Sequence, residues 1–327
     1  MAGMDETVSP MPVSGAMARF VEAHLARHPR DRSYVDLLLA NREFSPADKQ
    51  YPGWLRYNLN GIDSGRRLIT RIEELIGPLR EARVLDIGAG GGGNSIALAE
   101  HGCRVTAVEI DEFRLSWLRT RVADHSLPIT IVQEPLESLP ADQIFDFVIC
   151  NAVLEHVDDW QAFLDEVLRR CPTGSLYLAW PNKFSLLEIR ADQHYGLFGA
   201  VFLTGRLRRL QQPYLRLRGV TRNAWVTAVP TAGAVRRFVQ QRNREHGFRD
   251  LMPEGFAKIR TPETIRHAGA RRVLQLLKQL RIPDTLLARL IVSQKPTREV
   301  LVTTRSLRHL TVPDKLIKAE TPPKTGH

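Results

Sequence analysis

A glycine-rich stretch preceded by an acidic residue is the part of this sequence best suited to bind a ligand. Gly88 opens a run of six residues that contains five glycines, Asp86 stands two positions before it, and an apolar-periodic run extends from Ser95 to Glu100. This order predicts a strand, a tight turn and a helix. Glycine lets the backbone turn sharply and approach a ligand closely. The unpaired N–H groups at the start of the helix favour a carboxylate or phosphate.

Two classes of cofactor use this geometry. Gly88, Gly90 and Gly93 form G-x-G-x-x-G, and Glu109 follows about 20 residues later, as in a dinucleotide site. Asp86 argues against a dinucleotide, because the pyrophosphate would bring further negative charge close to its carboxylate. A cationic ligand fits better. The stretch V-L-D-I-G-A-G-G-G, which begins at Val84, resembles the first motif of class I S-adenosylmethionine-dependent methyltransferases, whose cofactor has a sulfonium and an α-ammonium group.

This resemblance implies S-adenosylmethionine as the cofactor and assigns roles to residues at strand ends. Glu109 ends the second expected strand, where the family's acidic residue binds the ribose hydroxyls, and a carboxylate can accept hydrogen bonds from both of them. After the third strand the family has an acidic residue near the adenine amino group. Glu134 is assigned to that role, although Pro135 occupies the expected position. The implied cofactor-binding residues are Asp86, Gly88, Gly90, Gly92, Glu109, Glu134 and Asn151.

The stretch after the fourth strand narrows the branch of the family. F-D-F-V begins at Phe145 and L-E-H-V at Leu154, and together they resemble a signature of methyltransferases that act on small molecules and quinones. No N/D-P-P-Y/F motif follows the strand, which argues against methylation of adenine amino groups. Cys171 precedes Pro172, the reverse of the order in cytosine C5 methyltransferases, which argues against a covalent cysteine mechanism.

Two histidines are candidates for the base that an acceptor hydroxyl would need. Methyl transfer from a sulfonium is an in-line displacement that requires near-attack geometry and exclusion of water, and a hydroxyl must also lose its proton. His156 follows the fourth strand, and His194 follows Asp192, which is expected to orient or charge-stabilise it. The alternatives are that Glu155 and His156 fix the loop after the strand and that His194 caps a turn. P-N-x-F-S at Pro181 and H-Y-G-L-F-G at His194 resemble segments of bacterial methyltransferases found with glycan and glycolipid assembly.

An arginine-rich segment without acidic residues follows the fifth strand. Residues 193–244 contain no Asp or Glu but ten arginines, and the apolar run 197–203 precedes the first of them. Such a pattern is typical of a segment that lies on an anionic lipid surface. We therefore expect residues 197–222 to contact a membrane, or to receive a lipid-linked or diphosphate-bearing acceptor. The alternative is a substrate lid whose apolar run packs on the core. RNA is disfavoured, because Tyr214 and Trp225 are too sparse for a stacking platform.

Composition and cysteine usage favour the cytoplasm. The chain has 327 residues and a formal charge of +10, which favours an anionic partner. Its three cysteines are widely spaced without C-x-x-C, so neither a disulfide framework nor a metal site is expected. Asp5, Glu6 and Pro10 interrupt any signal-like apolar run, and the stretch 195–205 is too short to span a bilayer. We expect a cytoplasmic protein, peripheral to the membrane if residues 197–222 bind lipid.

An alternation of strands and helices that begins at Arg83 must position these residues. Strands are expected at 84–87, 104–109, 129–132, 145–151, 175–179, just after Gly247 and at 299–304, with helices at 160–170, 234–246, 262–280 and 284–292. This pattern predicts the α/β class. The resemblance implies a Rossmann-like seven-stranded methyltransferase sheet with helices on both faces, an N-terminal helical arm and an insertion after strand 5. Ligands in such folds bind at the carboxyl ends of the strands.

The expected organisation has three parts. They are a disordered start and helical arm at 1–80, a methyltransferase core at 81–312 with an Arg-rich substrate or lid insertion at 182–230, and a disordered tail at 313–327. Within the arm, helices are expected near 17–27 and 34–39, a loop around Pro46 and Pro52, and a helix capped at Asp63. The arm is expected either to cover the cofactor or to pack against the sheet edge.

The predicted function is S-adenosylmethionine-dependent methyl transfer to an oxygen atom of a small-molecule, sugar or lipid-linked acceptor. Two alternatives remain open at this point. One is an RNA-directed methyltransferase, and the other is a non-catalytic protein that binds an adenosyl compound or a dinucleotide.

Overall fold

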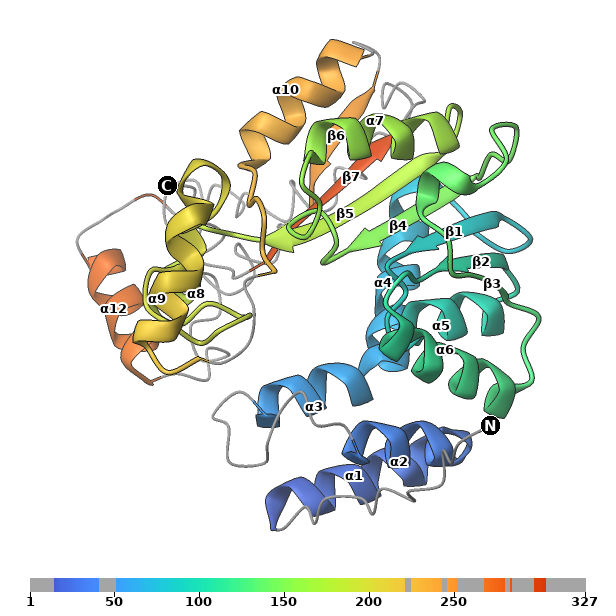
Figure 1. The fold of residues 1–327 in the computed structure, drawn as a ribbon, viewed down its shortest axis with the longest axis horizontal. Coiled ribbons are helices and arrows are strands. Elements are labelled where there is room, and N and C mark those ends of the chain that lie inside the picture. The colour runs from blue at the N-terminus through green and yellow to red at the C-terminus, as the bar shows by residue number, and fades with distance from the viewer. Residues whose placement is uncertain are drawn as a thin grey trace, which may run out of the picture.

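A seven-stranded sheet forms the centre of the molecule, with the strand order β3-β2-β1-β4-β5-β7-β6 (Figure 1). The structure is a computed structural model that describes residues 15–40, 51–220, 225–242, 246–251, 268–279, 283 and 297–303. The strands are β1 (Arg83–Ile87), β2 (Arg104–Val108), β3 (Thr130–Val132), β4 (Phe147–Asn151), β5 (Ser175–Pro181), β6 (Gly247–Asp250) and β7 (Thr297–Thr303). β1 to β5 pair in parallel, whereas β7 is antiparallel to β5 and β6. The predicted fold is confirmed. The strand order reverses between β1 and β4, which is where such sheets bind ligands.

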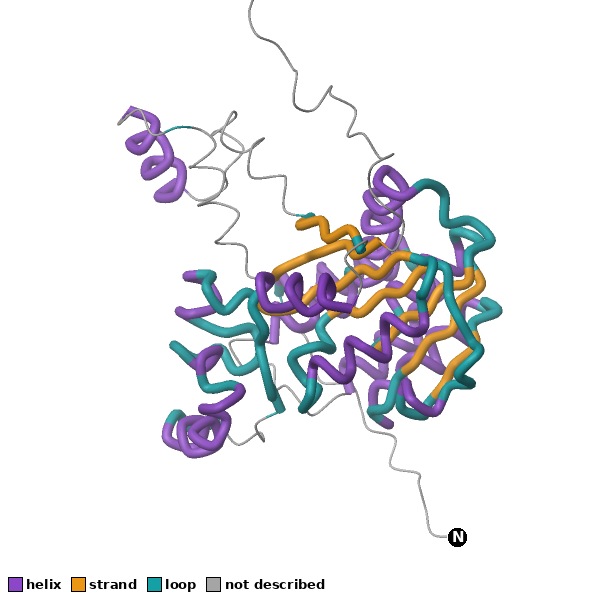
Figure 2. Tube along the Cα trace, turned by 90° about the horizontal axis from the view of Figure 1, so that it is seen from above, coloured by secondary structure: helices purple, strands orange, loops and turns teal. Residues whose placement is uncertain are grey.

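Helices cover both faces of this sheet, because its strands are apolar on both sides. Figure 2 shows the strands between helices on their two sides. Alternate residues of β5 illustrate the two layers. Leu176, Leu178 and Trp180 pack in one core with α7 (Trp160–Arg170) and α10 (Ala232–Arg242). Tyr177 and Ala179 pack in the other core with α4 (Gly61–Ile76) and α5 (Gly93–Glu100).

The N-terminal arm consists of α1 (Ala16–Arg27), α2 (Arg32–Ala40), α3 (Tyr51–Leu59) and α4. The apolar residues of α1 to α3 form a separate cluster with Trp117 of α6 (Glu112–His125), and α1 and α2 lie below α4 and α6 in Figure 1. Two expectations are corrected here. Pro52 lies inside α3 rather than in a loop, because a proline in the first turn of a helix loses no hydrogen bond. α4 begins at Gly61, so Asp63 lies in its first turn and pairs with Arg27 instead of capping the helix.

The segment between β5 and α10 is an addition to the alternating core, as expected. It contains α8 (Leu186–Arg190), α9 (Gln211–Leu217) and two short 3₁₀ turns, and it lies on the side toward which β5 points (Figure 1). Its apolar run is divided, since Ala200 and Val201 are buried in the core whereas Phe198 and Phe202 are exposed.

The predictions for the C-terminal helices and the two ends of the chain fall only partly on described residues. The helix expected at 262–280 corresponds to α12 (Ala268–Gln279). The helix expected at 284–292, the start before residue 15 and the tail from 313 lie outside the described residues. In the part of the chain that is described, no helix is long and apolar enough to cross a bilayer.

Candidate active site

The glycine turn lies between β1 and α5 and is held by the end of β2. The N–H groups of Gly88 and Ala89 both donate to the Val108 carbonyl, at 2.8 and 3.0 Å. Gly88 has a φ of +66°, and a Cβ atom there would lie 2.3 Å from Val153. Gly90 has a φ of +54°, and the position of its missing Cβ faces open space. Gly92, also at positive φ, is the N-cap of α5. The turn is therefore closed on one side and open on the other, which suits the close approach of a ligand.

Glu109 lies directly beside this turn. Its side chain is 6% exposed, and one oxygen accepts from the Gly90 N–H at 2.8 Å while the other accepts from the Asp111 N–H at 2.9 Å. Each carboxylate oxygen has a second lone pair. The fixed carboxylate can therefore still accept hydrogen bonds from a ligand diol, so its geometry fits the predicted role.

Asp86 lies beneath the turn rather than on its surface. It is 1% exposed, and its carboxylate accepts a hydrogen bond from the Ser95 hydroxyl at 2.6 Å. Burial, with the charge of Glu109, raises the pKa of Asp86 to about 7, against the effect of the Ser95 hydrogen bond. A cationic ligand above the turn would favour the charged form of this carboxyl, so the residues present fit a sulfonium-bearing cofactor.

Tyr57 of α3 extends to the end of β4, where the sequence analysis did not place any part of the arm. Its hydroxyl is hydrogen-bonded to Asn151, and desolvation together with the charges of Glu155 and Asp86 raises the pKa of that hydroxyl. Because Tyr57 is 64% exposed, the charges of Glu155 and Asp86 affect its pKa more than desolvation does. Asn151, a predicted cofactor residue, is thus next to an aromatic side chain that the sequence could have revealed only if α3 had been recognised as a helix.

The predicted bases lie together beyond Asn151. The His156 Nδ1 atom is 3.2 Å from the Trp225 carbonyl, and the two rings stack at 4.5 Å. The His194 ring meets both of them edge-on, at 5.2 and 5.3 Å, and its Nε2 atom is 3.8 Å from a Glu155 oxygen. The Arg114 guanidinium, which follows the end of β2, lies 5.3 Å from the Trp225 ring. This contact joins the histidine group to the strand edge that contains Glu109.

Burial raises the pKa of Glu155 and lowers the pKa of His156. Glu155 is fully buried, and neither of its carboxylate oxygens has a hydrogen-bond partner among the described residues. Burial raises the pKa of Glu155 to about 8. Burial also lowers the pKa of His156 to about 4, with the charge of Arg114 acting in the same direction. His156 is therefore neutral at pH 7. Ionised Glu155 is favoured by its own backbone N–H and by the His194 imidazole 3.8 Å away, but these two groups do not offset the effect of burial on its pKa.

Asp192 acts on the loop of His194 through the backbone. Its carboxylate accepts from the N–H groups of His194, Tyr195 and Leu197, at 2.8 to 3.0 Å. These bonds shape the turn that presents His194, whereas Glu155 is the carboxylate that the imidazole approaches. Glu134, the predicted adenine residue, is exposed just after β3, at the same edge of the sheet.

Glu155, His156 and His194 also have the composition of a metal site. One ligand atom from each lies within 4.8 Å of the other two. No metal site was expected from the spacing of the cysteines. That spacing could not have revealed this group, because the group contains no cysteine. His194 is far from the other two along the chain and approaches them only because the segment after β5 folds back.

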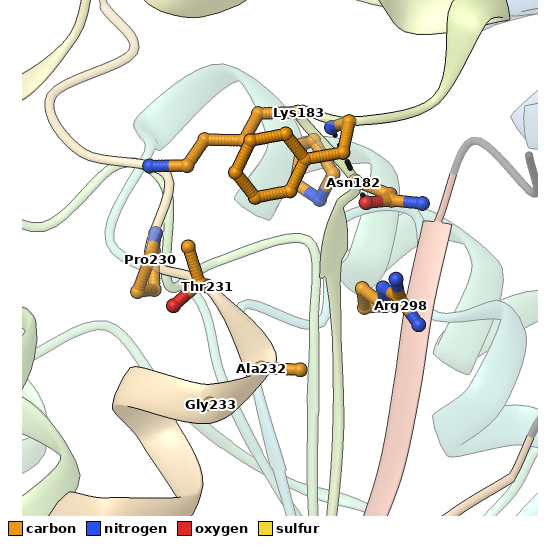
Figure 3. Close-up of a pocket in the computed structure, with 9 residues that line it drawn as sticks. Asn182, Lys183, Pro230, Thr231, Ala232, Gly233 and Arg298 are labelled. Carbon is orange, nitrogen blue, oxygen red and sulfur yellow. Dashed lines mark hydrogen bonds between the residues drawn. The ribbon is translucent and has the colours of Figure 1, made fainter. Parts of the chain in front are cut away.

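Two hollows lie at the end of β5, and only the smaller one is lined by a member of this group. A cavity of about 170 Å³ is lined by Pro181, Asn182, Lys183, Phe184, Pro230, Thr231, Ala232, Gly233 and Arg298. Figure 3 shows Lys183, Asn182 and Arg298 at this cavity, at the ends of β5 and β7. A much smaller hollow of about 10 Å³ shares Pro181 with it and is lined by His194 and Asp192. The two cationic side chains make the larger cavity suitable for an acid group.

Similarity to known proteins agrees with this geometry. Curated relatives include a ubiquinone biosynthesis O-methyltransferase of Rickettsia conorii, 26% identical over 170 residues that cover 50% of this chain and 56% of the relative. A protein of the same name from Bordetella avium is 36% identical over 119 residues, 34% of this chain and 48% of the relative. The chain spans about half the length of these curated relatives.

Solved structures are more distant in sequence. Magnesium protoporphyrin IX methyltransferase of Synechocystis, with bound S-adenosylhomocysteine, is 14% identical with a TM-score of 0.47, and the match covers 88% of this chain and 99% of that one. Residues 85–178 match the model of the methyltransferase domain family. This range includes most of the glycine turn's surroundings, from β1 through Glu109 and Asn151 to His156. With the confirmed sheet order and a turn that fits its cofactor, residues 85–178 form a methyltransferase domain of the class I S-adenosylmethionine-dependent type.

Proposed function

We propose that this protein transfers a methyl group to an oxygen atom of a small-molecule acceptor that bears an acid group. The observation that supports this most directly is the position of the Glu155–His156–His194 group beside Asn151, at the edge of the sheet that also contains the glycine turn. The names of the curated relatives, which are O-methyltransferases, favour oxygen over nitrogen or carbon.

The cofactor residues in this proposal are those that the resemblance implied. Bound S-adenosylmethionine supplies an activated methyl group. Glu109 binds the ribose hydroxyls, Asp86 contributes negative charge beneath the turn, and Gly88, Gly90 and Gly92 leave room for the ligand. Asn151 lies at the end of β4 and Glu134 faces the adenine side. This assignment uses the lone pairs that remain on Glu109 after its two backbone hydrogen bonds.

The histidine group is proposed to bind the acceptor hydroxyl and to deprotonate it. A general base is most effective when its pKa is near the working pH, so His156, with a pKa of about 4, is a weak base. His194, whose Nε2 atom is 3.8 Å from the Glu155 carboxylate, is therefore proposed as the base.

The acid group of the acceptor is proposed to bind between Lys183 and Arg298. The cavity that they line shares Pro181 with the small hollow beside His194, so an acid group bound there would lie on the same side of the sheet as the histidine group. A phosphate or diphosphate fits two cations better than a neutral sugar does.

A lipid-linked acceptor would also account for the exposed surface of the insertion. Its large apolar side chains at the surface are Phe184, Leu186, Leu187, Phe198, Phe202, Leu207, Leu210 and Leu217. Exposed arginines at 206, 209, 216 and 218 accompany them, which suits an anionic lipid surface. We propose that residues 197–222 contact such a surface.

Vesicle flotation at low salt tests this surface. The protein should float with vesicles that contain phosphatidylglycerol and not with neutral vesicles. Arg209→Glu combined with Arg216→Glu should abolish flotation, whereas the matched control Arg236→Glu with Arg237→Glu on α10 should not. Equal flotation of both double variants, or no flotation of the unmodified protein, would contradict the proposed contact of residues 197–222 with an anionic lipid surface.

Calorimetric titration with S-adenosylmethionine, S-adenosylhomocysteine and NAD tests the cofactor. We expect binding of both adenosyl ligands and not of NAD, with at least a tenfold loss in Glu109→Gln and none in Glu137→Gln, which is exposed. Transfer is then measured with methyl-labelled S-adenosylmethionine and paired hydroxyl acceptors, with and without a phosphate. Adenosyl binding without transfer to any of them would favour a non-catalytic protein, and transfer to RNA would replace the proposed acceptor.

A further inference from the structure

We infer that Glu155, His156 and His194 bind a divalent metal ion. The role that this ion would have in methyl transfer rests on the proposed function, but its binding does not. The three side chains come from two parts of the chain, the turn after β4 and the loop after α8, and one ligand atom of each lies within 4.8 Å of the others.

The buried carboxylate of Glu155 lacks the partners that such a group normally has. A buried carboxylate is normally paired or hydrogen-bonded, because an isolated buried charge is costly. Glu155 is fully buried, and both of its oxygens lack a hydrogen-bond partner in the described structure. The nearest charged partner recorded is His194, whose Nε2 atom is 3.8 Å away, too far for a hydrogen bond. The carboxylate thus faces a position where a cation would compensate it.

The second argument is the orientation of His156. Its Nδ1 atom faces the Trp225 carbonyl at 3.2 Å. A carbonyl oxygen only accepts hydrogen bonds, so Nδ1 bears the proton and Nε2 presents its lone pair. Metal-ligating histidines are commonly held by such a bond from the other ring nitrogen to a backbone carbonyl.

The donor set selects the kind of metal. Two imidazoles and one carboxylate favour Zn²⁺, Mn²⁺, Co²⁺ or Fe²⁺ over Mg²⁺ and Ca²⁺, which prefer oxygen ligands. Ligand atoms lie about 2.0–2.2 Å from Zn²⁺, so binding would draw the three side chains closer together. Three protein ligands leave at least one coordination position for another molecule.

That open position would bind the acceptor oxygen. A metal-bound hydroxyl loses its proton more readily, so the O–H bond would break with release of the proton to solvent, and the oxygen would then be the nucleophile. His194 would serve as a ligand in this state, and the metal would replace it as the group that activates the hydroxyl.

Titration of the full-length, chelator-treated protein with Co²⁺ tests the site without any acceptor. We expect one equivalent to bind with visible d–d absorption, and Zn²⁺ to displace it. Glu155→Gln and His194→Asn should each weaken Co²⁺ binding by at least about 100-fold. The matched controls Glu137→Gln and His101→Asn should bind as the unmodified protein does. Absence of Co²⁺ binding, or equal affinity in Glu155→Gln and the unmodified protein, would overturn the inference.

A thermal readout covers the case in which a variant folds poorly. Saturating Mn²⁺ should raise the melting temperature of the unmodified protein and of both controls, but not that of Glu155→Gln or His194→Asn. An equal rise in all five proteins would show that the ion binds elsewhere and would overturn the inference. The same samples are titrated with S-adenosylhomocysteine after chelation. Cofactor binding without metal binding refutes only the metal site, and metal binding without cofactor binding refutes only the proposed function.

Discussion

Two fully buried carboxylates in this molecule have opposite surroundings. Asp31, in the arm, accepts hydrogen bonds from His24 and His125 at 2.8 Å each and from the Arg121 guanidinium at 2.5 and 2.9 Å. Glu155, after β4, has no hydrogen-bond partner within the described residues. Although burial would raise the pKa of Asp31, the hydrogen bonds from His125, His24 and Arg121 lower it below its ordinary value. Burial raises the pKa of Glu155 to about 8.

The surroundings of Asp31 explain how the arm reaches the glycine turn. Arg121, held by Asp31, donates to the Gly91 carbonyl at 3.0 Å and lies 4.1 Å from the Tyr34 ring. A Cβ atom at Gly91 would lie 2.6 Å from the Tyr34 hydroxyl. The arm therefore packs on α6 and on the outer side of the turn, and the charge cluster around Asp31 fixes it there.

The difference between the two carboxylates indicates that Asp31 has a structural role and Glu155 a functional one. Asp31 has every donor it needs from the chain itself, so its cluster can stabilise the fold in any state of the protein. Glu155, which has the His194 imidazole 3.8 Å away and no hydrogen bond from another described residue, is a cost to the fold in its ionised form, and such costs are concentrated at functional sites. The comparison leads to three predictions with effects of decreasing size.

The largest effect is expected for Asp31→Asn. The change leaves the Arg121 charge buried without its partner, and breaking a buried ion pair in this way costs about 3–5 kcal/mol. Urea unfolding should show this loss. Glu81→Gln is the matched control, because Glu81 pairs with Arg104 at the surface, where both side chains are exposed, and should cost less than about 1 kcal/mol. Equal small losses in both variants would mean that the buried cluster does not hold the arm.

The second prediction concerns Glu155 and pH. Because its pKa is raised to about 8, the folded metal-free protein keeps a proton that the unfolded chain has released, so the free energy of unfolding falls as pH rises toward 8. The lowered pKa of His156 acts in the opposite direction, but only between about pH 4 and 6.5. Between pH 6.5 and 8, His156 therefore does not oppose the contribution of Glu155.

Melting curves across that interval measure this contribution. Relative to Glu155→Gln, the unmodified protein should lose between about 1 and 2 kcal/mol of stability from pH 6.5 to 8. Asp86 and Glu188 also have raised pKa values, so only the difference between the two proteins is informative. Saturating Mn²⁺ should abolish it. Parallel curves without metal would show that the Glu155 carboxylate is compensated after all.

The smallest effect is expected for Tyr57→Phe. The change removes one hydrogen bond to Asn151 and leaves the ring, so affinity for S-adenosylhomocysteine should fall by about 3- to 10-fold. Tyr214→Phe removes a hydroxyl from the insertion, where it bonds to the Phe198 carbonyl, and should leave this affinity unchanged. If the two variants bind alike, the arm has no direct part in the cofactor site.

Much of the fold could be predicted from local sequence. Each strand from β1 to β7 was expected within about two residues of its observed bounds, because buried strands are apolar runs that turn residues delimit. α3 was missed, because Pro52 reads as a loop residue unless its position in the first helical turn is known. Tyr57 was missed with it.

The sequence by itself determined the turn from Asp86 to Gly92 and the place of Glu109, because short-range spacing and the absence of Cβ atoms dictate that geometry. Only the tertiary structure decided which carboxylate meets which partner. Arg121 and Asp31 are 90 residues apart in the chain, and His194 approaches Glu155 through a segment that folds back after β5. Such contacts depend on how whole elements pack, and no local pattern records whether a buried charge will find its donor.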